Sequence, residues 1–451
     1  MAKSHQINMT EGPLLKKIII FSIPLMLTGM LQLFYNAADI VVVGKFAGHE
    51  SLAAVGSTSS LINLIVNLFF GLSLGSGVIV AQSIGANNKV RLTRVVHTSM
   101  LLSLICGIFV CIIGFSLANP LLSLMGTPGD VLPKATLYMR IYFLGMPAFM
   151  VYNFGAAILR SSGDTKRPLM ILSISGIVNV GLNLIFVICF NMGVAGVALA
   201  TIISQYVSAV RIVLILINEN ADYKLFIKKL RIYKQELLQI ITYGMPIGIQ
   251  SSCFAISNVI IQSSINTFGT ITVAGNSAAS NVEGFIYQAT NSIAQAGLTF
   301  SGQNTGAGNF KRIKKVLVLC AALSTGFGFI VGSVILFFKE PLLSLYSGNA
   351  EVIKAGVTRM EIMCVFYCLC GVMESISNVS RGMGKSFVPM IITLVFVCFV
   401  RVVWIYTVFK YFNTQQSIYW SYPVTWSLAI VGQLIYFVFI YKSKVKKINC
   451  V

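Results

Sequence analysis

Apolar stretches long enough to cross a lipid bilayer recur along the whole chain. A helix needs about 20 apolar residues to span ~30 Å of hydrocarbon, and twelve stretches reach this length. They lie at 17–43, 52–80, 93–118, 133–159, 168–190, 194–217, 238–266, 271–300, 313–338, 352–380, 386–410 and 418–441. The pattern therefore predicts an all-α integral membrane protein with twelve transmembrane helices.

The composition agrees, because 56% of the residues are hydrophobic and 10% are charged, whereas soluble domains carry about 25% charged residues. The net charge of +20 would suit nucleic acid, but the cations lie in alternate loops, with 24 of the 33 Lys and Arg on one side. The positive-inside rule then places both termini in the cytoplasm of a multi-pass cell-membrane protein. We expect a lipid bilayer and no nucleic acid as partner. The opposite side carries Lys45, Lys134, Arg140, Lys339, Lys354, Arg359 and Lys410, and the spans contain Arg211 and Arg401.

Motifs of soluble enzymes occur only in the wrong context. Residues 71–75 read Gly-Leu-Ser-Leu-Gly, a nucleophile-elbow pattern, but they lie inside an apolar span, and we interpret them as helix packing. Residues 382–386 resemble part of a phosphate loop, but position 379 is Val where that loop needs its first glycine. We expect no catalytic residue, no cofactor and no enzyme activity. We also expect no cleaved signal peptide, because no small-residue cleavage site follows a short apolar core.

The chain contains an internal repeat. Residues 81–88 and 302–309 read Ala-Gln-Ser-Ile-Gly-Ala-Asn-Asn and Gly-Gln-Asn-Thr-Gly-Ala-Gly-Asn, 221 positions apart, and each segment opens a basic loop. At the same offset, Pro-Leu-Leu-Ser-Leu occurs at 120–124 and at 341–345. The shift moves six spans onto six in the same orientation, which indicates a parallel repeat.

The repeat predicts two homologous six-helix bundles, an N-lobe at 1–217 and a C-lobe at 238–451, joined by a basic cytoplasmic linker at 218–237. Pro24 and Pro246 occupy corresponding positions in the two halves. Proline removes a backbone donor and bends a helix, so we predict helix bending at both residues, with a role in packing as the alternative. We expect the substrate site between the lobes and, since one chain supplies both lobes, a monomer.

The first predicted span carries the best ionisable candidate, Asp39, with Gln32, Tyr35 and Asn36 on the preceding turns. A carboxylate at mid-bilayer costs about 2.5–3.5 kcal/mol, so such acids are candidates for function. Desolvation favours the neutral form of the carboxyl group, whereas hydration or a cation favours the charged form. Asp39 is therefore suited to bind and release a proton or Na⁺, and the alternative is a structural acid that orders the helices.

Amides and a hydroxyl of later spans extend this candidate site. Asn179 and Asn183 lie four residues apart on one helix face, and Thr201 lies near the middle of the next span. Their oxygens suit a hard monovalent cation, and we regard Asp39 and Asn179 as candidate Na⁺ ligands. Interhelical hydrogen bonding, worth about 0.6 kcal/mol per bond in membranes, is an equally good interpretation.

The second half places its polar groups elsewhere. Residues 260–261, the counterparts of Asp39, are both Ile, whereas 271–300 is unusually polar and predicts a helix that faces an aqueous cavity. We expect the acids of this half to attract cationic substrates, with an anchoring role near the turn at 381–384 as the alternative for Glu374. The predicted cavity residues of the two halves are Gln32, Tyr35, Asn36, Glu283, Tyr287, Gln288 and Glu374.

The Gln-x-x-Gly-Ala segments at 82–86 and 303–307, together with Pro24, Asp39 and the twofold six-span repeat, resemble the multidrug and toxic compound extrusion (MATE) family. The resemblance covers essentially the whole chain. It implies two six-helix bundles that form a V-shaped transporter, which exports organic cations in exchange for H⁺ or Na⁺.

The resemblance also implies roles for single residues. Asp39 matches the family's first-helix acid, Asn179 its fifth-helix asparagine and Thr201 its sixth-helix threonine. Asn183 departs from the pattern, because many relatives of the bacterial damage-inducible type have Asp at this position. The amide removes one negative charge, which favours protonation of Asp39 over Na⁺ binding as the coupling event. The seventh-helix acid of another subgroup is absent from 238–266.

These observations favour a secondary active multidrug exporter that works by alternating access. In this hypothesis, protonation of Asp39 from outside bends the first helix at Pro24 and expels a lipophilic cation. The first alternative, a lipid or lipid-linked saccharide flippase of the same superfamily, would need several cavity arginines to bind pyrophosphate. The second, an integral-membrane enzyme or receptor, conflicts with the missing paired catalytic residues and with the parallel duplication.

Overall fold

The computed structural model describes residues 6–46 and 49–449, which form helices joined by short connections, with no strand among them. The helices of the first half are α1 (Leu14–Phe46), α2 (His49–Gly85), α3 (Lys89–Leu124), α4 (Leu132–Leu144), α5 (Met146–Ser161), α6 (Lys166–Leu184), the π-helical η1 (Ile185–Cys189) and α7 (Gly193–Asn218). A 3-10 turn, η2 (Ile227–Lys229), follows in the predicted linker. The helices of the second half are α8 (Lys234–Asn266), α9 (Thr270–Gly306), α10 (Phe310–Phe337), α11 (Lys339–Ser344), α12 (Ala350–Gly382), α13 (Phe387–Thr393), the π-helical η3 (Leu394–Phe399), α14 (Val400–Trp404), the π-helical η4 (Ile405–Phe409), α15 (Lys410–Phe412) and α16 (Gln415–Asn449).

Most of these helices meet the requirements of a membrane span. Within the described residues, ten are long and apolar enough to cross a bilayer, and α4 with α5 would make an eleventh. The prediction of an all-α membrane protein is therefore confirmed. α9, which contains the predicted span 271–300, has 37 residues but is too polar to be among these ten.

One predicted span is not a single straight helix. The range 133–159 forms α4 and α5, which meet at an angle of 46°. Gly145 separates the two helices, and Pro147 stands in the first turn of α5, where the missing N–H of proline is tolerated but a continuous helix is not. The bend therefore follows from local sequence.

The internal repeat reappears as repeated local geometry. Asn88 and Asn309 cap α3 and α10 by accepting a hydrogen bond from the backbone N–H three residues later. The residues before these caps, Asn87 and Gly308, both have positive φ, 51° and 70°, which closes the preceding helix. Each half also has a π-helical segment at its corresponding position, η1 and η4.

The described chain divides into two compact units. One contains Leu27–Ser252 with the residues up to Ile7, and the other contains Asn8–Met26 with the residues from Cys253 onward. α1 and α8 therefore begin in one unit and end in the other. The predicted lobes divide the chain between its two repeats instead, and that division stays a prediction.

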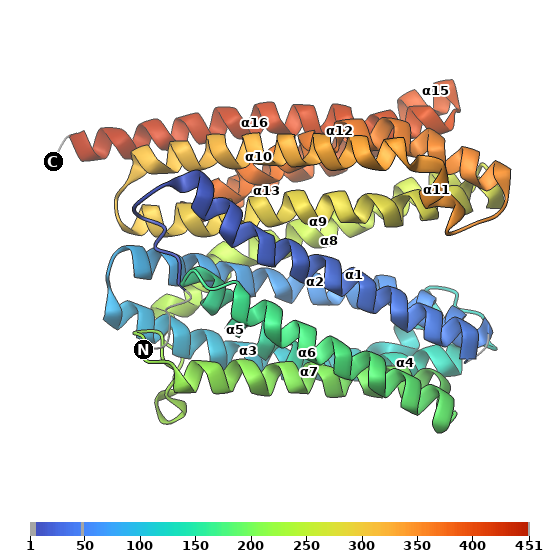
Figure 1. The fold of residues 1–451 in the computed structure, drawn as a ribbon, viewed down its shortest axis with the longest axis horizontal. Helices are drawn as coiled ribbons and strands as arrows, with labels where there is room; N and C mark the ends of the chain where they lie inside the picture. The colour runs from blue at the N-terminus through green and yellow to red at the C-terminus, as the bar shows by residue number, and fades with distance from the viewer. Residues whose placement is uncertain (1–5, 47–48, 450–451) are drawn as a thin grey trace. The chain divides into compact units, whose positions relative to one another are not determined.

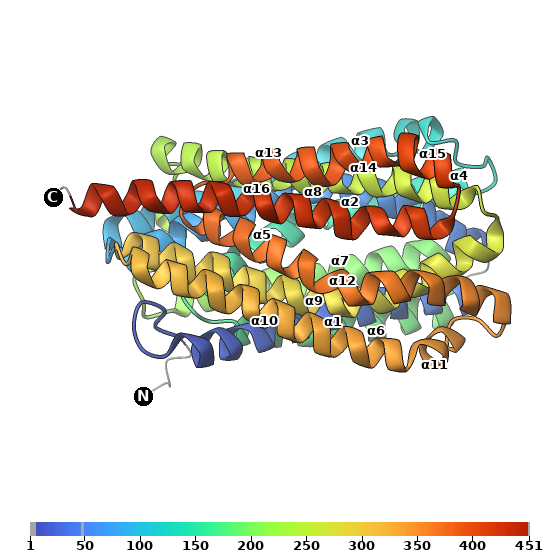
Figure 2. The same ribbon diagram turned by 90° about the horizontal axis from the view of Figure 1, so that it is seen from above.

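Each unit has its own helix packing and apolar core. In the first unit, α3 packs against α4 and α5, and α7 packs against α5 and α6 (Figure 1). In the second unit, α12 contacts α9, α10 and α16, and α16 runs beside α13 and α14 (Figure 2). Buried apolar side chains fill the space between these helices, including Val96, Phe154 and Ile158 in the first unit and Ile286 and Met360 in the second.

Glycines bring α2 and α8 into close contact within the first unit. A Cβ atom added at Gly71 would lie 2.3 Å from the backbone N of Gly248, and one added at Gly75 would lie 2.5 Å from the backbone N of Gly244. On each of the two helices the glycines are four residues apart, a spacing that lets membrane helices approach closely. The interpretation of 71–75 as helix packing is confirmed.

An arginine near the start of α10 holds the chain segment that precedes α1. In the second unit, Arg312 donates from Nε to the carbonyl of Met9 at 3.2 Å and from Nη2 to the carbonyl of Glu11 at 2.7 Å. In the first unit, the corresponding Arg91 of α3 donates from Nη2 to Oε1 of Gln239, near the start of α8, at 2.7 Å. Arginines at corresponding positions of the two repeats thus fix the beginning of α1 and the beginning of α8.

Candidate functional site

Three helices of the first unit bring the four predicted coupling residues together. Nδ2 of Asn183 donates a hydrogen bond to Oδ1 of Asp39 and approaches Oδ1 of Asn179 at 3.4 Å. Nδ2 of Asn179 in turn approaches Oγ1 of Thr201 at 3.4 Å. Asp39 on α1, Asn179 and Asn183 on α6, and Thr201 on α7 therefore form one polar cluster, called the Asp39 cluster below.

Local helix geometry explains how these side chains meet. Asn179 and Asn183 are four residues apart and therefore lie on one face of α6, where both are buried. Thr201 donates its hydroxyl proton to the carbonyl of Val197 at 2.9 Å, which leaves the oxygen lone pairs directed at Asn179. The π-helical η1 begins at Ile185, two residues after Asn183, and such segments are frequent at functional sites.

Three tyrosines lie near the Asp39 cluster. The ring of Tyr35 occupies the space above Gly176 of α6, where an added Cβ would lie 1.8 Å from the ring, and its hydroxyl approaches the carbonyl of Ser173 at 3.4 Å. Tyr138 and Tyr142 of α4 lie within electrostatic range of Asp39. Sequence reasoning missed these two tyrosines, because no motif connects the fourth predicted span with Asp39.

Two predicted neighbours of Asp39 lie outside the cluster. Gln32 and Asn36 are exposed on α1, because a helix turns by about 100° per residue and only part of its surface faces α6. Their predicted contribution to a substrate cavity stays a prediction.

The Asp39 cluster can hold a proton or a monovalent cation. The side-chain oxygens of Asp39, Asn179, Asn183 and Thr201 are the ligand type that hard cations prefer, and Oδ1 of Asn183 has no hydrogen-bond partner among the described residues. No three His, Cys, Asp or Glu side chains come together in the described part of the chain. The donor set thus fits H⁺ or Na⁺ better than a transition metal.

The second unit holds a buried ion pair that corrects one assignment. Arg359, expected in a loop, is buried in α12, and it forms two hydrogen bonds with the carboxylate of Glu283, at 2.9 and 2.8 Å. Its Nη1 donates to Oδ1 of Asn276 at 2.7 Å. An arginine near a helix end can reach water or another helix, and its sequence position does not distinguish the two. Glu283 is only 1% exposed, so its predicted role as an attractor of substrate cations stays a prediction.

The other predicted cavity residues of the second unit lie on two helices. Oε2 of Glu374 on α12 is 4.0 Å from Nη1 of Arg381, the residue it was alternatively expected to anchor near. On α9, Tyr287 is 39% exposed and Gln288 is partly buried. Contact of these residues with a substrate stays a prediction.

Both candidate bending residues lie inside continuous helices. Pro24 is buried within α1 and Pro246 within α8. α1 passes from one compact unit to the other between Met26 and Leu27, close to Pro24. Bending at these prolines stays a prediction.

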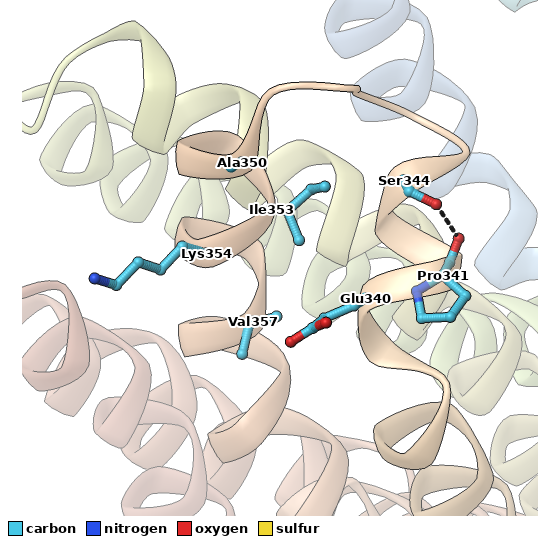
Figure 3. Close-up of a pocket in the computed structure, with 7 residues that line it drawn as sticks. All are labelled: Glu340, Pro341, Ser344, Ala350, Ile353, Lys354 and Val357. Carbon is cyan, nitrogen blue, oxygen red and sulfur yellow. Dashed lines mark hydrogen bonds between the residues drawn. The ribbon is translucent and has the colours of Figure 1, made fainter.

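A pocket of about 670 Å³ lies between α11 and the start of α12 (Figure 3). Glu340 and Lys354 are its charged residues, and Ser344 donates a hydrogen bond to the carbonyl of Pro341 at 2.8 Å. None of the predicted site residues lines it, so this pocket is separate from the candidate chemistry.

Comparison with known proteins identifies the family. The MatE family model matches residues 24–185 and 246–407, two segments whose starts lie 222 positions apart, like Pro24 and Pro246. Because the matches cover more than half of the chain, the protein belongs to the MatE family of multidrug efflux transporters.

Relatives and solved structures agree over nearly the full length. The probable multidrug resistance protein YoeA of Bacillus subtilis is 26% identical over 438 residues, 95% of this chain and 94% of the relative. The probable multidrug resistance protein NorM of Thermotoga maritima is 24% identical over 405 residues, 88% and 86% of the two chains. Among solved structures, the outward-facing conformation of a multidrug resistance MATE family transporter has a TM-score of 0.91 at 24% identity and covers 97% of this chain and 98% of its own. A MATE crystal structure in the straight conformation has a TM-score of 0.92 at 23% identity and covers 99% of this chain and all of its own.

These similarities confirm the expected MATE fold and family. The chain is therefore a multi-pass membrane transporter and not an enzyme. Transport by members of its family is coupled to the movement of an ion.

Proposed function

We propose that the protein exports lipophilic organic cations in exchange for H⁺ by alternating access, with Asp39 as the residue that binds the proton. The hydrogen bond from Asn183 to Asp39 is the observation that carries this proposal. It connects the acid of α1 to the buried amides of α6, so a change in the charge of Asp39 acts directly on the contact between these helices.

An amide is well suited to partner a carboxyl group that gains and loses a proton. Asn carries both a donor and an acceptor. With the anionic Asp39, Asn183 donates, as it does in this structure. With the protonated Asp39, rotation of the amide would let Oδ1 of Asn183, which has no hydrogen-bond partner among the described residues, accept the new proton.

The cluster's charge favours H⁺ over Na⁺ as the coupling ion. Asp39 is the only acid among the four predicted coupling residues, and three neutral oxygens would complete a Na⁺ site. A single carboxylate takes up one proton without any further ligand. Na⁺ bound through Asp39 and Asn179 is the competing assignment.

The proposed cycle uses α1 as the moving element. The deprotonated Asp39 leaves the first-half cavity open to a lipophilic cation on the cytoplasmic side. Protonation from outside removes the charge, α1 bends at Pro24, and the cavity shrinks and releases its substrate. The proposal includes a monomer with both termini in the cytoplasm, because the basic loops lie on that side.

Efflux of ethidium from proteoliposomes tests the coupling ion. H⁺ and Na⁺ gradients are imposed separately on the wild type, on Asp39→Asn and on Asp130→Asn, the same change at an exposed residue outside the helices. We expect H⁺-driven efflux by the wild type and Asp130→Asn and none by Asp39→Asn. Full efflux by Asp39→Asn would contradict the role of Asp39, and efflux driven only by Na⁺ would reverse the ion assignment.

A lipid or lipid-linked saccharide flippase is the second candidate. The observation in its favour is that Arg401 is buried in a span of the second unit and forms no ion pair among the described residues, and arginine binds phosphate groups bidentately. A wild type that leaves ethidium in place under both gradients, but moves a fluorescent lipid between leaflets, would support this candidate over the exporter.

A further inference from the structure

Arg401 is a buried cation in the middle of a membrane span. It lies in α14, beside α16 (Figure 2), and π-helical segments stand on both sides of α14, η3 before it and η4 after it. Only 2% of Arg401 is exposed, and it is the largest fully buried side chain among the described residues.

The contacts of Arg401 leave its charge without an anion. Nη2 donates to Oγ1 of Thr425 at 3.1 Å, and Cζ lies 4.1 Å from the centre of the Tyr422 ring. Nε has no hydrogen-bond partner among the described residues, and none of their ion pairs includes Arg401. The nearby titratable groups Tyr367, Cys370 and Cys398 are of types that are neutral at pH 7 when unperturbed.

The neighbouring arginine does have an anion. Arg359 lies 5.9 Å from the centre of the same Tyr422 ring, but its guanidinium forms two hydrogen bonds with Glu283. Two guanidinium groups thus approach one ring, and only one of them is matched by a carboxylate. A buried charge without a partner is unfavourable in a membrane and marks a candidate for function.

The internal repeat places this cation beside the counterparts of two residues of the Asp39 cluster. At the offset of 221, Tyr422 corresponds to Thr201 and Arg359 to Tyr138. Arg401 follows the counterpart of Asn179 directly in the sequence. The counterparts of Asp39, residues 260–261, are both Ile, so the second half lacks the carboxylate and carries a guanidinium beside the counterparts of Asn179 and Thr201.

We propose that Arg401 binds the carboxylate of a transported compound, with Tyr422 as the platform that orients the guanidinium. The Nε edge of an arginine matches a carboxylate in geometry, and a pair of this kind is strong in a desolvated site. Arg401 is closed off in this structure, so a compound reaches it only in a conformation in which α14 and α16 separate. The proposal rests on the proposed export function and names the residue that recognises an acidic group on an exported compound.

Two dyes that differ in one charge test this site. Rhodamine B carries a cationic ring system and a free carboxylate, and its ethyl ester keeps the ring system but lacks the carboxylate. Binding of both dyes to the full-length protein in nanodiscs is measured by fluorescence polarisation for the wild type and Arg401→Gln. The matched control is Arg211→Gln, the same change at an exposed arginine of a first-half span.

We expect Arg401→Gln to weaken rhodamine B binding about tenfold or more and to change binding of the ester by less than about twofold. The control should leave both affinities at the wild-type values. Equal weakening for the two dyes, no weakening for either, or no binding of rhodamine B by the wild type would overturn the proposal.

Arg401→Lys keeps the test decisive if Arg401→Gln fails to fold. Lysine keeps the positive charge but lacks the planar fork, so we expect a smaller, still selective loss for rhodamine B. If Arg401→Lys binds rhodamine B as tightly as the wild type does, the proposed planar pairing of the guanidinium with the carboxylate is wrong. Efflux of the ester under an H⁺ gradient tests the proposed function separately, because the ester does not need Arg401.

Discussion

The amide of Asn183 determines the net charge of the Asp39 cluster. It donates to Asp39 without adding charge, so the Asp39 cluster reaches electrical neutrality when one proton binds. A second carboxylate at this position would leave a negative charge after protonation. In the proposed exchange, the coupling ion therefore depends on one side chain four residues from Asn179.

Asn183→Asp should make the transporter responsive to Na⁺. Two carboxylates in one buried site repel each other, and a bound cation relieves that repulsion. We expect Na⁺-driven ethidium efflux to rise about tenfold over wild type, equivalent to ~1.4 kcal/mol. The same change at the exposed Asn119 is the control, and the idea fails if Asn183→Asp responds to Na⁺ no better than Asn119→Asp.

The buried pair of Glu283 and Arg359 should respond very differently to one and to two substitutions. Glu283→Gln leaves Arg359 buried without an anion, which should cost about 3–5 kcal/mol, whereas changing both residues to Met should recover most of the loss. Thermal unfolding in detergent measures the difference. Glu361→Gln, which breaks the more exposed pair with Lys339, should cost ~0–1 kcal/mol. A double variant as unstable as the single one would contradict the explanation.

The sequence predicted the Asp39 cluster but not the Glu283 pair, for a physical reason. Asp39 stands out because an acid in a long apolar run has no other explanation than function or pairing, and the spacing of Asn179 and Asn183 fixes their common face. Arg359 lies only about two turns from the start of α12, where arginine side chains also reach water. Its partner lies on another helix, α9, and no spacing rule connects the two.

Helix contacts are specified by small residues as much as by apolar ones. Gly71 and Gly75 of α2 face Gly248 and Gly244 of α8 at backbone distance, so this contact has no room for a side chain. The spacing of glycines was visible in the sequence. The bend between α4 and α5 was visible as Gly145 and Pro147 but was not predicted, because hydropathy averages across it.

Gly75→Ala should loosen the contact between α2 and α8. The added methyl group would lie 2.5 Å from backbone atoms, and overpacking of this kind costs about 1–3 kcal/mol. We expect a lower unfolding temperature and slower efflux. Gly326→Ala, at a glycine with open space around it, should leave both unchanged, and a neutral Gly75→Ala would show that the helices can separate freely.

The first parts of α1 and α8 each belong to a different compact unit from the rest of the same helix. Asn8–Met26 belongs to the same unit as the residues from Cys253 onward, and the first part of α8 belongs to the other unit. Arg312 and Arg91 hold these segments by direct hydrogen bonds. Neither homologous half is therefore complete without the other.

Dividing the chain in the 219–226 connection should give two fragments that work only together. Each fragment lacks a helix segment that its unit needs, so we expect co-expressed fragments to co-purify and to export ethidium, and either fragment alone to aggregate. Size-exclusion chromatography and the efflux assay measure both properties. Making the fragments adds residues at their new ends, so the control is an uncut chain that carries these residues at the division point. A stable, monodisperse first fragment would contradict the expectation.

The exchanged segments also impose an order on biosynthesis. Met26 and Cys253 are separated by 226 residues, and ribosomes add about 5–20 residues per second. For on the order of 10–50 s, the leading part of the first helix is present before the neighbours against which it finally packs. The nascent chain therefore completes the first unit only when the leading part of α8 has been made, and the second unit only after the helices beyond Cys253 have followed.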